Sequence, residues 1–313
     1  NLLVLTNSTL GIMESSSFQI TNDLTVITGG LVVVGHATLA CGGNLTLTNG
    51  ASLVVYGGIT NAVYTNSYGT LTGISNKLMV SSNCWIYPIS HSTNGGSVLF
   101  RVGSLAVLSG GGINADGRGY ARTNGPAHGG DAGANGGGGG GGYGGKGGSG
   151  SSGAGGNPYG STNAPLDPGS GGGNEPAESI LCGGNGGGAV RIEAAGGISI
   201  DGVVTANGTN GVAAGNGAGG GGSGGAIFMT CGSFEGSTNG ILRANGGNGG
   251  IAGTKGGGGG GGRIAVWIGV SEPRRNQYLA GNPSIVMMSE SYKYYVGTVS
   301  ITNGNGFTNL PPN

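Results

Sequence analysis

The sequence predicts an all-β fold, a β-solenoid (β-helix) in which short strands stack in successive coils. Three observations predict this class. Apolar residues alternate with polar ones or form short β-branched runs, strand-like segments recur at fixed spacings, and the scan finds no helical period. Glycine supplies 81 of the 313 residues, and both glycine and β-branched residues are poor helix formers.

The first repeat lies near the N-terminus. The segments LVL, LTV and LTL begin at Leu3, Leu24 and Leu45, and each step is 21 residues. Gly, Asn, Ser and Thr separate the three segments, as expected for turns between stacked coils.

A second repeat occupies the middle of the chain. GGAVRIEA begins at Gly187, GGAIFMTC at Gly224 and GGRIAVWI at Gly261, so both steps are 37 residues. GGSVLFRV at Gly95 opens an earlier copy that an insertion lengthens. Each unit therefore reads as strand, turn, strand, turn and glycine-rich tail.

The turn of each copy carries Asp116, Asn207 or Asn245, each directly followed by glycine. Asp-Gly and Asn-Gly favour turns in which the backbone takes positive φ. We therefore interpret these three residues as structural turn residues.

The glycine-rich tails have two readings. A glycine-rich segment without a period is usually a flexible linker. These tails, however, recur at one position of a repeat, and glycine helices of the threefold type can pack closely and exchange backbone hydrogen bonds. We expect the tails to pack as polyglycine-II helices, with flexible tails as the alternative.

Three regions follow from these patterns. Residues 1–94 are predicted to form N-terminal solenoid coils, and residues 95–270 the glycine-rich repeats with an insertion near 118–185. Residues 271–313 are predicted to form a C-terminal β cap or docking segment.

Charge and hydropathy exclude several partners. Twelve basic residues balance twelve acidic ones, and charged residues are only 8% of the chain. Without a basic surplus we expect no nucleic-acid partner, and without a long apolar run we expect no membrane span. Sparse charge also gives little protection against self-association.

The four cysteines leave two alternatives. Cys41, Cys84, Cys182 and Cys231 are too far apart in sequence for a CxxC metal or redox motif. They are candidates for one or two disulfides in an oxidising compartment, or for buried free thiols.

Catalytic residues are harder to find. Asp116 and Asp201, with Glu193 as a third carboxylate, are the candidates for glycoside hydrolysis, which needs two facing carboxylates. Asparagine replaces Asp116 at the aligned turns, and Asp201 lies in an Asp-Gly turn, so both are better explained by backbone conformation. We expect no enzyme activity, no cofactor and no metal site.

Two stretches carry a resemblance. RANGGNGG followed by GGGGGGGRIAVWI resembles the glycine-rich β-solenoid repeats of bacterial surface and exported proteins, and NLTLTNGASLVV resembles the coils of filamentous-haemagglutinin-like and autotransporter-passenger proteins. The resemblance covers roughly residues 95–270 and 44–55 and implies an architecture at the cell surface, not one activity.

The favoured function is an exported, non-enzymatic structural protein. It would self-assemble through β-strand pairing into an extracellular filament, sheath or surface layer, with itself as the main partner and surface glycans as a further one. The alternatives are a monomeric adhesin or a glycan- or ice-binding module, and a β-helix enzyme that degrades polysaccharides. The expected assembly residues lie near the two ends of the chain: Leu2, Leu3, Val4, Leu5, Tyr292, Tyr294 and Tyr295.

Overall fold

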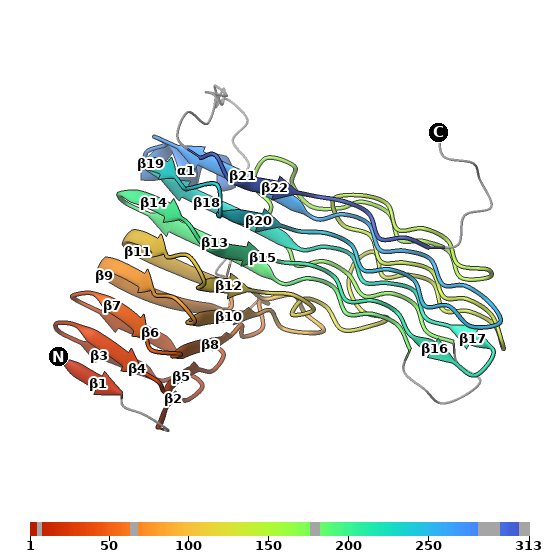
Figure 1. Ribbon diagram of the computed structural model, residues 1–313, viewed down its shortest axis with the longest axis horizontal. Coiled ribbons are helices and arrows are strands. Elements are labelled where there is room, and N and C mark those ends of the chain that lie inside the picture. Colours follow the sequence, from red (N-terminus) through yellow and green to blue (C-terminus); the bar gives the residue numbers. More distant parts are fainter. Residues whose placement is uncertain (5–7, 63–67, 176–181, 281–294, 307–313) are drawn as a thin grey trace.

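A computed structural model describes residues 1–4, 8–62, 68–175, 182–280 and 295–306. Within these ranges the chain forms two large sheets of parallel strands, one small antiparallel sheet and one α-helix. Neighbours in a sheet are not consecutive in sequence, as in the orders β1-β4-β7 and β2-β5-β8, because the chain leaves each sheet and returns one layer further along. Figure 1 shows these layers stacked from the N-terminal end upward.

The larger sheet has twelve strands, and the smaller has eight. The twelve are β1 (Leu2–Val4), β3 (Ser17–Ile20), β4 (Leu24–Ile27), β6 (Thr38–Cys41), β7 (Leu45–Thr48), β9 (Thr70–Val80), β11 (Val98–Val107), β13 (Ala189–Ala194), β14 (Gly197–Ile200), β18 (Ala226–Cys231), β19 (Ser233–Glu235) and β21 (Arg263–Ile268). The eight are β2 (Thr9–Ile12), β5 (Gly30–Val33), β8 (Ser52–Tyr56), β10 (Trp85–Ile89), β12 (Gly112–Asn114), β15 (Val203–Thr205), β20 (Ile241–Arg243) and β22 (Thr298–Ser300). The antiparallel pair is β16 (Ala213–Ala214) with β17 (Gly217–Ala218).

The fold class predicted from the sequence is wrong. In place of an all-β solenoid with polyglycine-II tails, the molecule has two large sheets of parallel strands together with helix α1 (Glu272–Leu279), which is a parallel-sheet arrangement. Helix α1 gives no clear helical period in the sequence, because it has only eight residues. The residues at its start are nevertheless typical of a helix N-terminus. Ser271 precedes it in an extended conformation, and Glu272 and a proline lie in its first turn.

The 21-residue spacing corresponds to strand register over one of its two steps. Leu24 lies opposite Leu45, as expected. At the first step, however, Leu2 rather than Leu3 lies opposite Leu24. The first step is therefore 22 residues, and this one extra residue shifts which N-terminal side chains face inward.

The 37-residue spacing holds over both steps. Val190 lies opposite Ile227, and Ile227 lies opposite Ile264. The earlier copy also aligns as expected, because Val98 lies opposite Val190.

Three columns of mostly apolar side chains fill the space between the sheets, and each residue of a column lies opposite the next across a parallel strand pair. The first column is Leu2, Leu24, Leu45, Leu78, Leu105, Ile198 and Phe234. The second is Leu10, Leu31, Leu53, Ile86, Ile113, Val204, Leu242 and Val299. The third is Phe18, Leu39, Thr72, Phe100, Ile192, Met229 and Val266.

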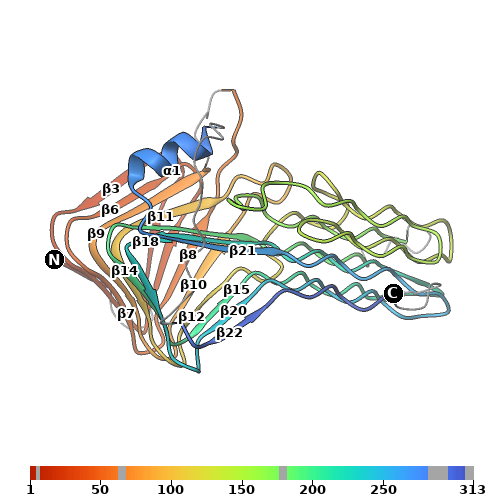
Figure 2. The same ribbon diagram turned by 90° about the horizontal axis from the view of Figure 1, so that it is seen from above.

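The glycine-rich segments leave the sheets together and run side by side, as Figures 1 and 2 show. Backbone hydrogen bonds join them: Gly222 N–H donates to Thr209 O at 2.9 Å, and Gly259 N–H donates to Gly247 O at 2.8 Å. A Cβ atom on Gly259 would lie 2.0 Å from Gly222 O. The segments are therefore packed backbone against backbone, with no room for side chains at these contacts.

We predict that Gly259→Ala destabilises the protein by about 1–3 kcal/mol or more, because the added methyl group must push two hydrogen-bonded backbones apart. Gly133→Ala is the matched control, since its Cβ would meet nothing within 4 Å and its φ is not in the left-handed region. Thermal unfolding of both variants measures the difference. Equal melting temperatures would show that the glycine-rich segments are not closely packed in solution.

Candidate functional site

The two aspartates considered for catalysis each accept a hydrogen bond from the backbone of another layer. Asp116 Oδ1 accepts a hydrogen bond from Asn207 N–H at 2.6 Å, and Asp201 Oδ1 accepts one from Ser237 N–H at 2.8 Å. Each carboxylate thereby ties its own layer to the next layer of the stack.

The predicted turn residues form one ladder. Asn207 Oδ1 accepts from Asn245 N–H at 2.8 Å, and Asn245 Oδ1 accepts from Thr302 N–H at 2.9 Å, which continues the bond from Asp116. The sequence suggested positive φ as the reason for these turns. Of the three glycines that follow the turn residues, only Gly117, after Asp116, has a positive φ. The repeated Asp or Asn is therefore explained by its side-chain oxygen more than by backbone strain.

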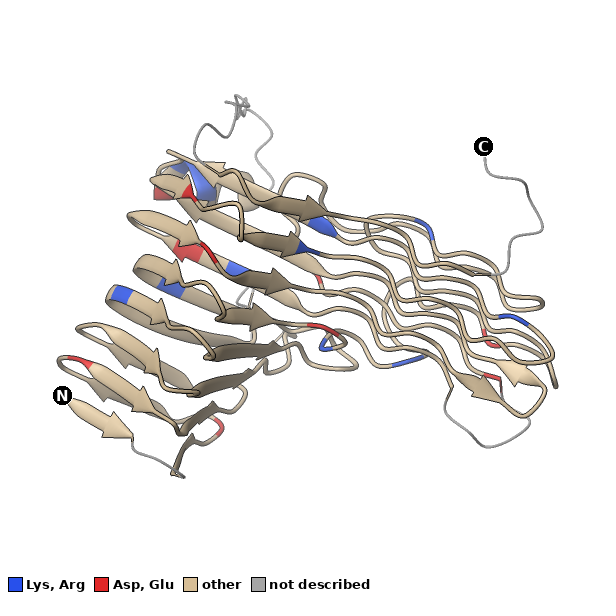
Figure 3. Cartoon of the chain, in the orientation of Figure 1, with Lys and Arg blue, Asp and Glu red and all other residues tan. Residues whose placement is uncertain are grey.

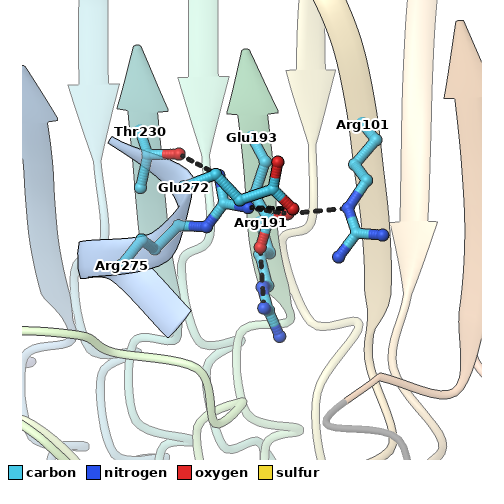
Figure 4. A network of polar contacts seen from close by, with 6 residues as sticks. All are labelled: Arg101, Arg191, Glu193, Thr230, Glu272 and Arg275. Atoms are coloured by element: carbon cyan, nitrogen blue, oxygen red, sulfur yellow. Dashed lines mark hydrogen bonds and ion pairs between the residues drawn. The ribbon is translucent and has the colours of Figure 1, made fainter. Parts of the chain in front are cut away.

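A buried network of charges lies on the outer face of the larger sheet. Glu193, on β13, is 2% exposed and lies among three arginines (Figure 4). Its carboxylate is 2.9 Å from Arg101 Nε, 2.8 Å from Arg191 Nη2 and 3.3 Å from Arg275 Nη2. Arg275 belongs to α1 and also lies 3.7 Å from the exposed Glu272.

The arginines of the network stabilise the ionised form of Glu193. Burial alone would raise the pKa of Glu193, but the hydrogen bond from Arg101 and the charges of Arg191 and Arg275 outweigh burial and lower this pKa. The hydrogen bond to Glu193 raises the pKa of Arg101, whereas burial lowers the pKa of Arg191. Glu193 is therefore ionised near neutral pH and fixes the helix to the sheet.

Helix α1 has a second, mostly aromatic anchor. The Tyr278 ring packs edge-on against Trp267 of β21 at 4.9 Å between centroids, and Tyr278 Oη accepts a hydrogen bond from Asn163 Nδ2 at 2.9 Å. Trp267 Nε1 donates to Asn163 O at 2.9 Å. The insertion that carries Asn163, the last strand of the larger sheet and the helix are thus joined at one place.

A groove of about 770 Å³ runs beside the network. Its lining comes from every layer of one row of strands, from Gln19 on β3 through Ser75, Arg101 and Glu193 to Gly269 after β21. Figure 3 shows how sparse charged residues are elsewhere, so this face stands out by its arginines.

The sequence signalled part of this site. Glu193 is one of the three carboxylates that the sequence suggests, whereas the three arginines are not among the predicted site residues. Arg101 and Glu193 occupy the same position of two aligned copies and lie opposite each other across β11 and β13. Register alone therefore predicts this ion pair, whereas nothing in the repeat places Arg275 beside it.

The predicted assembly residues divide between the two ends of the molecule. Leu2 packs against the core, Leu3 is 52% exposed and Val4 is buried. Tyr295 bridges to Gly236, and its ring lies 5.0 Å from Phe234 at the opposite end of the first column. The other three residues, Leu5, Tyr292 and Tyr294, lie outside the described residues.

All four cysteines are free thiols and are buried, the second of the two alternatives left by the sequence. Burial raises the pKa of the Cys231 thiol to about 12. A thiol with such a pKa carries almost no thiolate near neutral pH, so it is a poor nucleophile.

The described residues contain neither a cluster of metal ligands nor a membrane-spanning helix. Within the described ranges no three His, Cys, Asp or Glu side chains gather as metal ligands would. No helix in the described part of the chain is long and apolar enough to cross a membrane.

Comparisons with protein-family models, with curated proteins and with solved structures gave no match for this chain. The resemblance to bacterial surface repeats therefore stays a prediction.

We predict that Glu193→Gln lowers the free energy of unfolding by about 3–5 kcal/mol, because it removes the anion among three arginines, two of them buried. Glu235→Gln, on an exposed position of β19, is the control. Because the pKa of Glu193 is lowered, its contribution is present above the ordinary value of 4.5 and is lost as the pH falls through the folded-state pKa. Denaturant unfolding at several pH values should show this acid loss in the parent and not in Glu193→Gln.

We also predict that the native protein resists alkylation by iodoacetamide at pH 8 and that the unfolded chain takes up four labels, one per free cysteine. Mass spectrometry under non-reducing conditions counts the labels. Two labels or none in the unfolded chain would reveal disulfides.

Proposed function

We propose that this chain is a non-enzymatic structural protein whose copies add end to end by parallel strand pairing, forming a filament, sheath or layer outside the cell. The observation that carries the proposal is the exposure of the apolar columns at the ends of the stack. Within the stack their members are buried, whereas at the ends every member except Phe234 is partly or largely exposed.

The second column gives the strongest contrast. Its six inner members, from Leu31 to Leu242, are at most 1% exposed, whereas Val299 at its end is 53% exposed. Leu10 at its other end is only partly buried. Covering Val299 would remove apolar surface from water, which is favourable in proportion to the area covered.

The other two columns end in a similar way. Leu2 and Phe18 are partly buried at the N-terminal end, and Val266 is partly buried at the other. At the first column's C-terminal end, however, Tyr295 already covers Phe234. The C-terminal end is therefore open over two columns and closed over one.

Strand edges add directional hydrogen bonds to this apolar surface. Among the described strands, β1 pairs only with β4, β2 only with β5 and β3 only with β6. At the opposite end β21 pairs only with β18 and β22 only with β20. Unpaired edges of parallel strands are templates for another chain.

A second copy fits both ends at once. Within each of the two large sheets all strands run parallel, so the first layer of one copy can continue the last layer of another without reversing it. Such head-to-tail contacts do not close on themselves and therefore generate linear assemblies. The sparse charge of the chain offers little repulsion against this growth.

We predict that Val299→Glu abolishes end-to-end assembly, because it buries a carboxylate at the joint. Val212→Glu is the matched control, since Val212 is 52% exposed but lies in a glycine-rich segment away from the ends. Light scattering over a range of concentrations and negative-stain electron microscopy measure assembly. Val299→Glu copies keep an intact N-terminal end, so a small fraction of them should also shorten filaments of the parent protein.

Short isolated particles of the parent protein at all concentrations would contradict the proposal and favour a monomeric surface module. A protein that stays monomeric when isolated from its natural source would also contradict the proposal, because its ends would then be covered in some other way. Unchanged filaments with Val299→Glu would place the contact elsewhere.

A further inference from the structure

We propose that the groove beside Glu193 binds an acidic polysaccharide, with a sugar carboxylate paired to Arg101. This inference stands independently of end-to-end assembly, because the groove lies on the side of the stack and Arg101 belongs to β11, an inner strand.

The charge of the groove favours an anion. Three arginines surround Glu193, which can neutralise one of them, and Glu272 approaches Arg275 at 3.7 Å with its own side chain 68% exposed. The five side chains together carry one positive charge. In a chain with no net charge, this is a local surplus of positive charge beside a groove.

Arg101 is the arginine that a ligand can reach. Its side chain is 46% exposed, whereas those of Arg191 and Arg275 are 5% and 9% exposed. Among the described residues its only side-chain hydrogen bond runs from Nε to Glu193. Both Nη groups are therefore open to a carboxylate, which matches the fork of a guanidinium.

Glu193 prepares Arg101 for this contact. The bond from Nε holds the guanidinium at the groove, so less side-chain freedom is lost when a ligand binds. Arg275 stays beneath the groove surface: its side chain is 9% exposed, and its buried Nε has no partner among the described residues.

The shape of the groove favours a linear polymer. Its lining residues come from seven successive strands, β3, β6, β9, β11, β13, β18 and β21 or the turns that follow them. Parallel strands are about 4.8 Å apart, so the groove follows the stack for roughly 30 Å. A single small anion would use only a fraction of that length.

The floor favours a saccharide over a peptide. The five strands from β6 to β18 are paired on both edges, so an extended peptide finds no edge to join along most of the groove. Small residues line the floor, including Ala40, Gly73, Gly103 and Gly232, with Ser75 beside them. Sugar hydroxyls both donate and accept hydrogen bonds and so match the serine hydroxyl and the arginine fork.

Isothermal titration calorimetry with oligogalacturonate as the probe tests the proposal. We expect binding that weakens with added salt and that falls at least about tenfold in Arg101→Gln, the loss of one charge-assisted contact. Lys255→Gln makes the same charge change at an exposed position of a glycine-rich segment and should bind as the parent does. Circular dichroism and melting temperatures show whether each variant is folded.

Two further probes identify the ligand class. A neutral galactose oligomer of equal length should not bind measurably, and an oligo-glutamate peptide should bind more weakly than the uronate. Equal binding of the neutral sugar, tighter binding of the peptide, or unchanged uronate affinity in Arg101→Gln would each overturn the proposal. Because Arg101→Lys keeps the charge without the fork, partial recovery is expected there.

Discussion

Backbone hydrogen bonds between successive layers of the stack are the interaction on which the rest of the molecule depends. They hold the parallel strands in register, and they continue into the glycine-rich segments, where no side chains intervene. The 37-residue step passes through both parts: a Cβ on Gly262 would meet Gly225 O at 2.1 Å, and one on Gly225 would meet Gly188 O at 2.0 Å. Because each layer fixes the place of the next, an ordered sheet brings the glycine segments side by side, where hydrogen bonds between their backbones offset the entropy lost on ordering.

The same constraint explains how the polar residues are used. A turn residue with a short side-chain oxygen can accept the N–H of the next layer, and Asp116, Asn207 and Asn245 do so in succession. Register also places opposite charges next to each other, as with Arg101 opposite Glu193. Helix α1 then adds Arg275 to an ion pair that the sheet already makes, so the helix depends on the sheet more than the sheet depends on the helix.

Periodic features could be predicted from the sequence, and features that occur once could not. Leu24 and Leu45 reveal their register because the same strand pattern, LTV and LTL, recurs in two adjacent layers. The one-residue error at Leu3 arose because the continuous apolar run LLVL, residues 2–5, fits two registers equally well by letter alone. Helix α1 and its contact from Arg275 to Glu193 have no counterpart in the repeats, and the fold class was predicted wrongly at this point. The bond from Asn207 N–H to Asp116 could not be predicted from the sequence, because it depends on the packing of two layers that are far apart along the chain.

The side and the ends of the stack offer different chemistry, which lets them serve different partners. The ends expose apolar side chains and unpaired strand edges, which favour a continuation of the same fold, whereas the side groove combines arginine with small residues and backbone groups. Since the groove crosses the layers from β3 to β21, copies joined end to end would bring the groove of one to the groove of the next. A polymer lying along such a joined groove would contact more than one copy, so the weak contact of each Arg101 would be multiplied along the assembly. Tyr295 covers the first column and not the third, whose strands carry the groove, and so leaves this continuation open.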